Sequence, residues 1–330
     1  MESEKLIGKQ AAVQELAAAF AAGKLPHALL LTGEDGIGKK TLARAVCRML
    51  CCKEPTNGQP CGRCSACLKI DRQIHPDIFW IYPAGKSETI GVGEIKALLP
   101  RLYVLPNDAD CKIFVLSGAE RMNRFAQNAL LKMLEEPPED CFFILTAENA
   151  QALLPTVRSR VTQLQVPPAS RQEIVAELAR RFPSISEKQL ETAAARSGGN
   201  LGKAVSLCEQ PEKNRLYEDV EALLRALLSG DEAEVCLLMG PYCKQKQQAL
   251  EMVALLEVFF RDLAAQASGA SQLFSGDDAA ISALSGKIRL AGALAAMQSC
   301  DRFISAVRSN ANPALQLTVL ALELEQAVQG

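Results

Sequence analysis

The chain has 330 residues, of which 48% are hydrophobic and 22% are charged. This length predicts two or three globular domains, and the composition excludes an intrinsically disordered protein. Lys and Arg number 36 against 38 Asp and Glu. This balance argues against a strongly basic chain that binds nucleic acid by itself.

The N-terminus and the cysteines indicate the compartment. Glu2 and Glu4 stand where a secretory signal needs a basic region, and no run of about 18 apolar residues predicts a membrane-spanning helix. We therefore expect a cytoplasmic protein with no membrane partner. In the cytoplasm the 12 cysteines should stay reduced, so clustered cysteines are expected to bind metal rather than to form disulfides.

A glycine-rich loop follows the first predicted strand. Residues 28–32 form a short apolar run, and residues 39–51 follow with helical spacing. The loop between them is typical of a phosphate-binding loop, in which glycines let backbone N–H groups approach the phosphates and a lysine reaches their oxygens. A structural strand-to-helix turn is the alternative. The residues expected to bind nucleotide are Gly33, Gly36, Gly38, Lys39 and Thr41.

Lys40 disturbs this loop. The pattern requires Ser or Thr directly after the lysine to bind Mg²⁺, and Lys40 puts a second cation there. Thr41 comes one residue later, about 100° further round the helix, and is expected to point elsewhere. We therefore expect ATP or ADP to bind weakly or not at all, and without well-ordered Mg²⁺.

Four cysteines lie in the next segment, which is rich in turns. Two Cys-x-x-Cys steps share one cysteine, and another cysteine lies upstream. Four thiolates at this spacing can close a tetrahedron round Zn²⁺, so residues 52–67 predict a structural zinc module. The expected ligands are Cys52, Cys61, Cys64 and Cys67, with Cys51 as a rival for the first position. Buried cysteines acting as small hydrophobic residues are the alternative.

Two more buried strands are predicted further along the chain. They lie at residues 112–116 and 141–146, with a helix at about 124–136 between them that ends at a pair of prolines. Continuous apolar runs separated by helices indicate a parallel sheet that is covered on both faces.

The strand at 112–116 lacks the acids of an ATPase. A hydrolysing enzyme of the phosphate-loop class has Asp for Mg²⁺ at the end of this strand, and commonly Glu to orient water. Ser117 and Gly118 stand in that place, and Glu120 is expected to be a solvated residue rather than a displaced catalyst. The chain is therefore expected not to hydrolyse ATP.

Two arginines, Arg158 and Arg160, follow the strand at 141–146. An arginine here can act as an arginine finger, a planar cation offered to the γ-phosphate of a neighbouring subunit. From spacing alone, a surface ion pair with Asp or Glu is an equal alternative.

Helical patterns replace strands after Pro167 and Pro168. We expect three domains: residues 1–168, a small helical domain at 169–210, and a helical bundle at 211–330 that is rich in Ala and Leu.

Together these features resemble the bacterial clamp-loader family of AAA+ proteins. The stretches that carry the resemblance are residues 25–28, 75–77, 128–137, 159–161 and, more weakly, 312–315. The resemblance implies an α/β AAA+ core with a parallel sheet, a phosphate loop and an inserted zinc module, then a small helical lid domain and an all-α collar domain that oligomerises. It also implies that Arg160 is an arginine finger that acts in trans, with Val161 replacing the Cys of the family's Ser-Arg-Cys motif.

The resemblance further implies a function in DNA replication. Proteins of this family form a hetero-pentamer that loads the sliding clamp onto primed DNA, as part of the DNA polymerase III holoenzyme, a DNA-directed DNA polymerase. The implied partners are the gamma/tau and delta subunits, the sliding clamp and primer–template DNA.

Three departures point to a family member without its own ATPase activity. Two are Lys40 and the Ser117–Gly118 pair, and the third is Gly202, which takes the place of a nucleotide-sensing arginine and has Lys203 beside it as a substitute cation. The ATP-hydrolysing gamma/tau subunit is the alternative. A stand-alone zinc-containing DNA-binding or repair factor is a second alternative, although only 5% of the residues are aromatic.

Overall fold

The computed structural model describes residues 6–56, 59–85, 88–269 and 278–329. Its contacts divide the chain into two compact units, residues 1–173 with 200–202, and residues 174–199 with 203–330. The division into three domains stays a prediction. None of the described helices combines the length and the apolar character that crossing a membrane requires.

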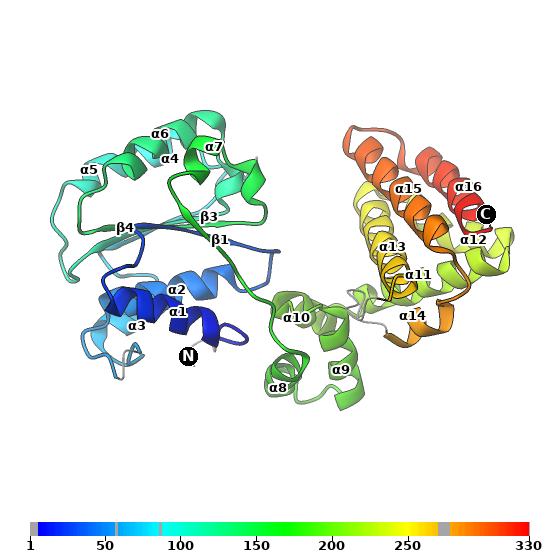
Figure 1. Cartoon of the computed structure of the whole chain (residues 1–330), viewed down its shortest axis with the longest axis horizontal. Helices are drawn as coiled ribbons and strands as arrows, with labels where there is room; N and C mark the ends of the chain where they lie inside the picture. The colour runs from blue at the N-terminus through cyan, green and yellow to red at the C-terminus, as the bar shows by residue number, and fades with distance from the viewer. Residues whose placement is uncertain (1–5, 57–58, 86–87, 270–277, 330) are drawn as a thin grey trace. The chain divides into compact units, whose positions relative to one another are not determined.

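The first unit is built on a five-stranded parallel sheet (Figure 1). The strands are β1 Ala28–Thr32, β2 Ile78–Ile81, β3 Lys112–Ser117, β4 Cys141–Ala147 and β5 Thr162–Gln165, in the order β2-β3-β4-β1-β5. All four pairings are parallel, so the loops after the strands meet at one edge of the sheet. This confirms the predicted sheet and its three apolar strands.

Helices cover both faces of this sheet (Figure 1). On one face lie α1 Gln10–Ala21, α2 Lys39–Cys51 and α3 Ser65–Asp71; on the other lie α4 Val92–Lys96, α5 Leu99–Leu102, α6 Arg124–Glu135 and α7 Pro155–Arg158. Successive strand residues alternate between the two layers, because Leu29 and Leu31 pack in the first core and Leu30 packs in the second. Two short 3₁₀ helices, η1 Ala119–Arg121 and η2 Ala150–Ala152, follow β3 and β4.

The rest of the described chain is helical, as the sequence predicts. Its elements are α8 Arg171–Arg181, α9 Glu187–Arg196, α10 Leu201–Glu209, α11 Pro211–Ser229, α12 Glu232–Met239, η3 Gly240–Lys244, α13 Lys246–Ala267, α14 Asp278–Leu284, α15 Leu290–Arg308 and α16 Pro313–Gln329. A Cβ at Gly292 would lie 2.3 Å from the carbonyl oxygen of Ala327. Only glycine therefore permits the close approach of α15 to α16.

Candidate functional site

A polar pocket of about 250 Å³ lies beside the loop between β1 and α2, at the carboxyl edge of the sheet. In open parallel sheets this edge is the usual place for a ligand. Side chains from the loop and from the ends of β3 and β4 line the pocket, among them Asp35, Lys39, Lys40, Ser117, Thr146 and Glu148. The structure thus brings the predicted phosphate loop and the end of β3 together.

The loop has the backbone shape that its glycines predict. Gly33, Gly36 and Gly38 have φ angles of 146°, 79° and 105°, which other residues rarely adopt. Lys39 begins α2, and its Nζ donates to the carbonyl oxygens of Gly33 at 2.7 Å and Glu34 at 2.8 Å. The lysine that would reach a phosphate is therefore bound by its own loop.

The charges of the pocket do not favour phosphate. Burial lowers the pKa of Lys39, and the nearby carboxylates of Asp35, Glu148 and Glu120 oppose this shift. Four lining residues are acidic and three are basic: Asp35, Glu88, Glu120 and Glu148 against Lys39, Lys40 and Arg121. A phosphate would enter a pocket without net positive charge.

Lys40 lies in this pocket, where the phosphate-loop pattern requires a magnesium ligand. Its Nζ lies 5.6 Å from the centre of the Tyr82 ring, within the range of a cation–π contact. Thr41 is not among the described residues that line the pocket. Sequence reasoning did not find Tyr82, because its contact with Lys40 joins two segments 42 positions apart.

The end of β3 carries no carboxylate. Ser117 is buried, and Gly118 has a φ of 72° and donates its N–H to Thr146 Oγ1 at 3.1 Å. Glu120, on η1, lines the pocket, and its Oε2 is buried without a hydrogen-bond partner among the described residues. Glu120 is thus half-buried at the edge of the pocket, and the expectation that it is a solvated residue holds only in part.

The turn at residues 200–202 packs directly on the phosphate loop. Asn200 Nδ2 donates to the Asp35 carbonyl at 2.7 Å, and the N–H of Gly202 donates to the Gly36 carbonyl at 3.1 Å. A Cβ at Gly202 would lie 2.6 Å from the Cα of Gly36. The loop in this shape therefore excludes an arginine at position 202. Lys203 Nζ lies 5.9 Å from the centre of the Tyr217 ring on α11, so this lysine contacts the helical part of the chain.

The four predicted cysteines form one cluster. The sulfur atoms of Cys52, Cys61, Cys64 and Cys67 all lie within 4.8 Å of one another. Tetrahedral coordination with Zn–S bonds of about 2.3 Å places sulfurs about 3.8 Å apart, so small shifts would close the site. Cys51 is buried in α2 and its thiol hydrogen-bonds that of Cys111, so Cys52 supplies the fourth sulfur.

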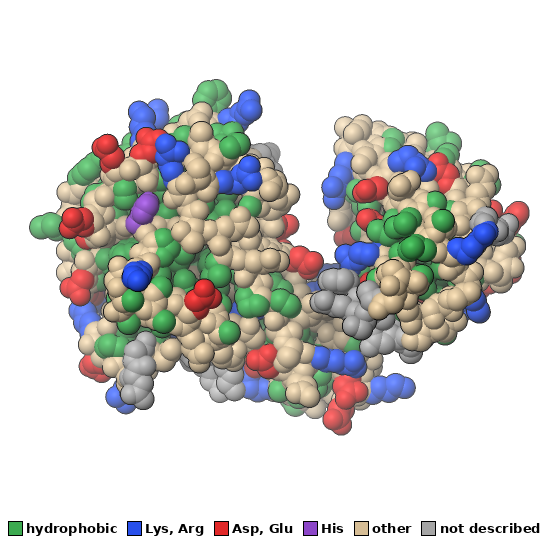
Figure 2. Space-filling model, viewed as in Figure 1, with side chains coloured by type: hydrophobic (Ala, Val, Ile, Leu, Met, Phe, Trp, Pro, Cys, Tyr) green, Lys and Arg blue, Asp and Glu red, His purple; other side chains and the backbone are tan. Residues whose placement is uncertain are grey.

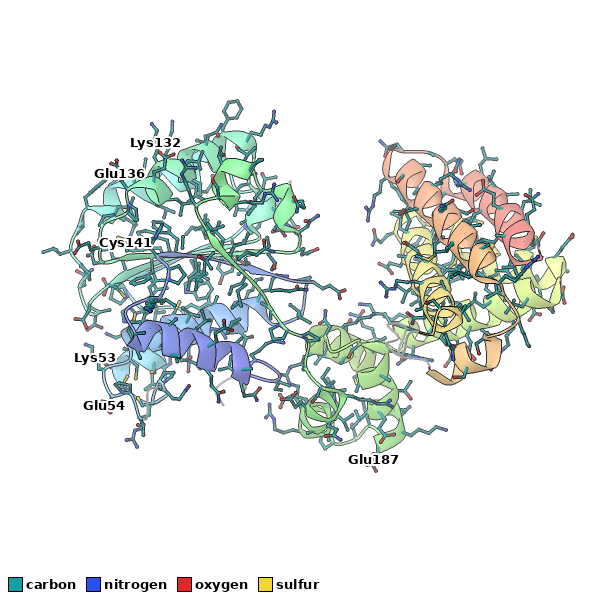
Figure 3. The ribbon with its side chains drawn as sticks, in the orientation of Figure 1. Lys53, Glu54, Lys132, Glu136, Cys141 and Glu187 are labelled. Carbon is teal, nitrogen blue, oxygen red and sulfur yellow. The ribbon has the colours of Figure 1, made fainter. Side chains whose placement is uncertain are left out.

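The backbone round the cluster suits thiolate ligands. The N–H of Cys61 donates to Cys52 Sγ at 3.2 Å, and the N–H of Cys64 donates to Cys61 Sγ at 3.3 Å. Burial raises the pKa of Cys64, but the backbone N–H groups near it outweigh burial and lower the pKa overall. Lys53 and Glu54, which follow Cys52, lie at the surface of the module (Figure 3). The cluster can bind a metal with four thiolates.

Buried Asp77, directly before β2, links this module to the sheet through hydrogen bonds and ion pairs. Its carboxylate accepts from the N–H groups of Asn107, Asp108 and Ala109 at 2.7, 2.7 and 2.9 Å. Asp108 in turn pairs with Lys53, directly after Cys52, and with Lys69, two residues after Cys67. Burial alone would raise the pKa of Asp77, but the three N–H donors outweigh it and hold the pKa below its ordinary value.

Asp77→Asn is expected to lower the free energy of unfolding by about 2–4 kcal/mol, because the amide would point an N–H group at backbone N–H donors. The wild-type contribution should persist above the ordinary pKa of 3.8 and disappear as the pH falls below it, since the folded-state pKa is depressed. Urea unfolding of both proteins from pH 3 to pH 7 measures this. Asp110→Asn, an exposed neighbour, should change stability by less than about 0.5 kcal/mol.

Arg160 lies at the surface, in the turn between α7 and β5. Its Nη2 is 2.8 Å from Glu135 Oε1, at the end of α6, and its Nη1 donates to the Thr156 carbonyl at 3.0 Å. Arg158 instead donates to Gln151 Oε1 at 2.5 Å. From spacing alone either arginine could be the arginine finger. In the structure the two arginines contact different residues.

Buried Gln127 on α6 supports the start of α7, the helix that precedes the Arg160 turn. Its Oε1 accepts from the N–H of Leu154 at 2.7 Å, directly before α7, and its Nε2 donates to the Met122 carbonyl at 3.1 Å. The sequence analysis missed Gln127. The only local signal was a polar residue on the buried face of a predicted helix.

Comparisons with known proteins find relatives among the subunits of DNA polymerase III. A family model described as DNA polymerase III, delta subunit, matches residues 8–170. The delta-prime subunit of Pseudomonas aeruginosa is 34% identical over 201 residues, 61% of either chain. The Escherichia coli delta-prime subunit is 31% identical over 66% of this chain and 65% of its own, and the gamma subunit of Buchnera aphidicola from Schizaphis graminum is 30% identical over 62% and 57%. Residues 8–170 are thus similar to the corresponding part of gamma and delta-prime subunits of DNA polymerase III.

The DNA polymerase III match includes the phosphate loop, the cysteine cluster and the arginine turn. The chain spans about three fifths of the length of the curated gamma and delta-prime subunits that it matches. Among solved structures, a Thermotoga maritima protein related to the gamma subunit is 19% identical, with a TM-score of 0.45 over 96% of this chain and 99% of its own. The Bacillus subtilis clamp-loader delta protein is 10% identical, with a TM-score of 0.39 over 95% and 99%.

Proposed function

We propose that the chain is the delta-prime subunit of a bacterial DNA polymerase III clamp loader and does not itself hydrolyse ATP. The observation that carries this proposal is the pair Ser117–Gly118 at the end of β3, where a hydrolysing subunit needs carboxylates for Mg²⁺ and water. Lys40 in the pocket supports it. Gamma and delta-prime relatives match at similar identity, so these residues, and not the degree of similarity, favour delta-prime over the ATP-hydrolysing gamma/tau alternative.

In this proposal the chain acts as one member of a hetero-pentamer with gamma/tau and delta subunits. It offers Arg160 to the ATP site of a neighbour, and the assembly opens the sliding clamp and places it on primer–template DNA. Residues 1–168 form the AAA+ core, residues 169–210 the lid, and residues 211–330 the collar that joins the subunits. The exposed position of Arg160 supports the trans role, since a guanidinium at the surface can reach a partner.

We also propose that the cysteine cluster binds one structural Zn²⁺. Four soft thiolates at tetrahedral spacing suit zinc, and a fully thiolate-coordinated site leaves no open position for catalysis. The metal would hold the turns of residues 52–67 together beside α2 and α3.

A stand-alone DNA-binding factor fits the surface less well. On the face shown in Figure 2, Lys and Arg side chains are interspersed with Asp and Glu on each unit, without a continuous basic stripe. Such a stripe is the electrostatic requirement for binding DNA by one chain. Contact with DNA through the assembled complex needs no such stripe on this subunit.

The purified chain alone is expected to show no ATP turnover above background, at any Mg²⁺ concentration. The physical reason is that neither carboxylate needed for Mg²⁺ and water stands at the end of β3. A phosphate-release assay measures this, with a gamma/tau subunit at the same concentration as the positive control. Turnover by the isolated chain that Lys39→Ala abolishes would contradict the proposal and favour the gamma/tau alternative.

A further inference from the structure

The guanidinium of Arg160 is held from two sides. Nη1 donates to the Thr156 carbonyl at 3.0 Å and to Ser159 Oγ at 3.4 Å, both within the turn that carries the arginine. Nη2 lies 2.8 Å from Glu135 Oε1. Glu135 is therefore the contact that fixes this side chain to a different element, the C-terminal end of α6. None of these three contacts uses Nε.

Stability does not explain this ion pair. The side chains of Arg160 and Glu135 are 35% and 47% exposed, and ion pairs this open to water contribute little to folding. Glu135 is also the last residue of α6, where the helix dipole disfavours a carboxylate. What the pair does provide is order, because an arginine on the surface otherwise samples many rotamers.

We propose that Glu135 is the positioning residue for Arg160, holding its guanidinium in the orientation in which it meets the triphosphate of a nucleotide on a neighbouring subunit. This inference rests on the trans role proposed for Arg160. A planar guanidinium has five N–H donors, so it can stay bound to Glu135 through one edge while Nε and a remaining N–H contact phosphate oxygens. Glu135 itself touches no substrate in this arrangement.

The test uses the complex reconstituted from this chain, gamma/tau, delta, the clamp and primed DNA. Glu135→Gln keeps the shape of the side chain and removes its charge. We expect single-turnover ATP hydrolysis at the neighbouring site to slow about 3- to 10-fold, the effect of weakening one charged hydrogen bond in the transition state, while the affinity of that site for ATP stays unchanged. The melting temperature of the chain should not change, which separates positioning from a structural role.

The matched control is Glu136→Gln. Glu136 is the next residue, exposed at the end of α6 (Figure 3), and no contact between it and Arg160 is seen. This variant should turn over ATP like the wild type. The double variant Glu135→Gln with Arg160→Ala should be no slower than Arg160→Ala alone, since a residue that acts through Arg160 has nothing left to position.

Each other outcome overturns the inference. Wild-type turnover by Glu135→Gln, with a reduced rate for Arg160→Ala, removes Glu135 from the mechanism and leaves the trans role of Arg160 standing. A further loss in the double variant shows that Glu135 acts independently of Arg160. Wild-type turnover by Arg160→Ala removes the trans role and the positioning role together.

Discussion

Cys64→Ser is expected to strip the metal from the cysteine cluster and to unfold the module of residues 52–67. Cys64 belongs to both Cys-x-x-Cys steps, and a serine hydroxyl replaces a thiolate poorly as a zinc ligand. Structural zinc contributes roughly 10–16 kcal/mol to the folding of isolated zinc-finger peptides. Cys64 and Cys67 also pack in the core of the first unit, so the loss should be greatest in the segment between α2 and α3.

The effect should remain local. The strands of the sheet and the helices α1 and α2 keep their buried apolar contacts without the metal, so the core is expected to stay folded. The module, in contrast, should become sensitive to protease between α2 and α3. Removal of the metal from the wild-type chain with a chelator should have the same effect, because the thiolates alone repel one another.

Metal analysis of protein purified without chelator is the measurement, and about one zinc per wild-type chain is expected. Cys236→Ser is the matched control, because Cys236 is exposed on α12 and lies outside the cluster. It should retain the metal and the protease resistance. A wild-type chain that is free of metal and still folded throughout residues 52–67 would show that the cysteines pack without a metal.

Features determined by local sequence were predictable. The phosphate loop needs glycines at positions with positive φ and a helix directly after it, and both appear as a continuous string of residues. The cysteine cluster is also local, and the structure chooses Cys52 over Cys51 because helix α2 ends between them. β5 was missed, since an edge strand with mostly exposed polar residues lacks the apolar run that marks a buried strand.

Features created by tertiary contacts could not be predicted. The contact of Gly36 with Gly202 joins residues 166 positions apart, and the ion pair of Glu135 with Arg160 depends on how α6 and α7 pack. The burial of Glu120 Oε2 beside the pocket likewise depends on how η1 packs, which the sequence does not state. In each case the residue can be read from the sequence, but its contact partner depends on how distant elements pack.

The departures from an ATPase site form one consistent arrangement. Lys39 is bound by its own loop carbonyls, Lys40 faces Tyr82, and Gly202 leaves room only for the backbone of the loop. Two cations of the loop, Lys39 and Lys40, thus have partners within the chain, and the place of the sensing arginine is taken by glycine. Restoring Asp and Glu at positions 117 and 118 would therefore not restore turnover by itself.

Arg160→Ala is expected to cause the largest loss of function of any single substitution that leaves the fold intact. Arginine fingers contribute roughly 10³–10⁵ in rate where they have been best characterised. In the proposed pentamer Arg160 would serve only the site next to this subunit, so steady-state turnover should fall several-fold, and single-turnover hydrolysis at that site should show the full effect. If clamp loading by the proposed complex depends on hydrolysis at this site, it should fall with turnover.

Folding and assembly should be normal in this variant. The pair of Arg160 with Glu135 is exposed, and such pairs are worth about 0–1 kcal/mol, so its loss should not unfold the chain. Arg158→Ala is the neighbouring control, since Arg158 contacts Gln151 and is expected to leave turnover close to the wild-type rate. The two variants should form complexes of the same mass. If Arg160→Ala in a complete complex hydrolyses ATP and loads clamps as fast as the wild type, then Arg160 is only the surface partner of Glu135, and this subunit contributes no catalytic group to its neighbour.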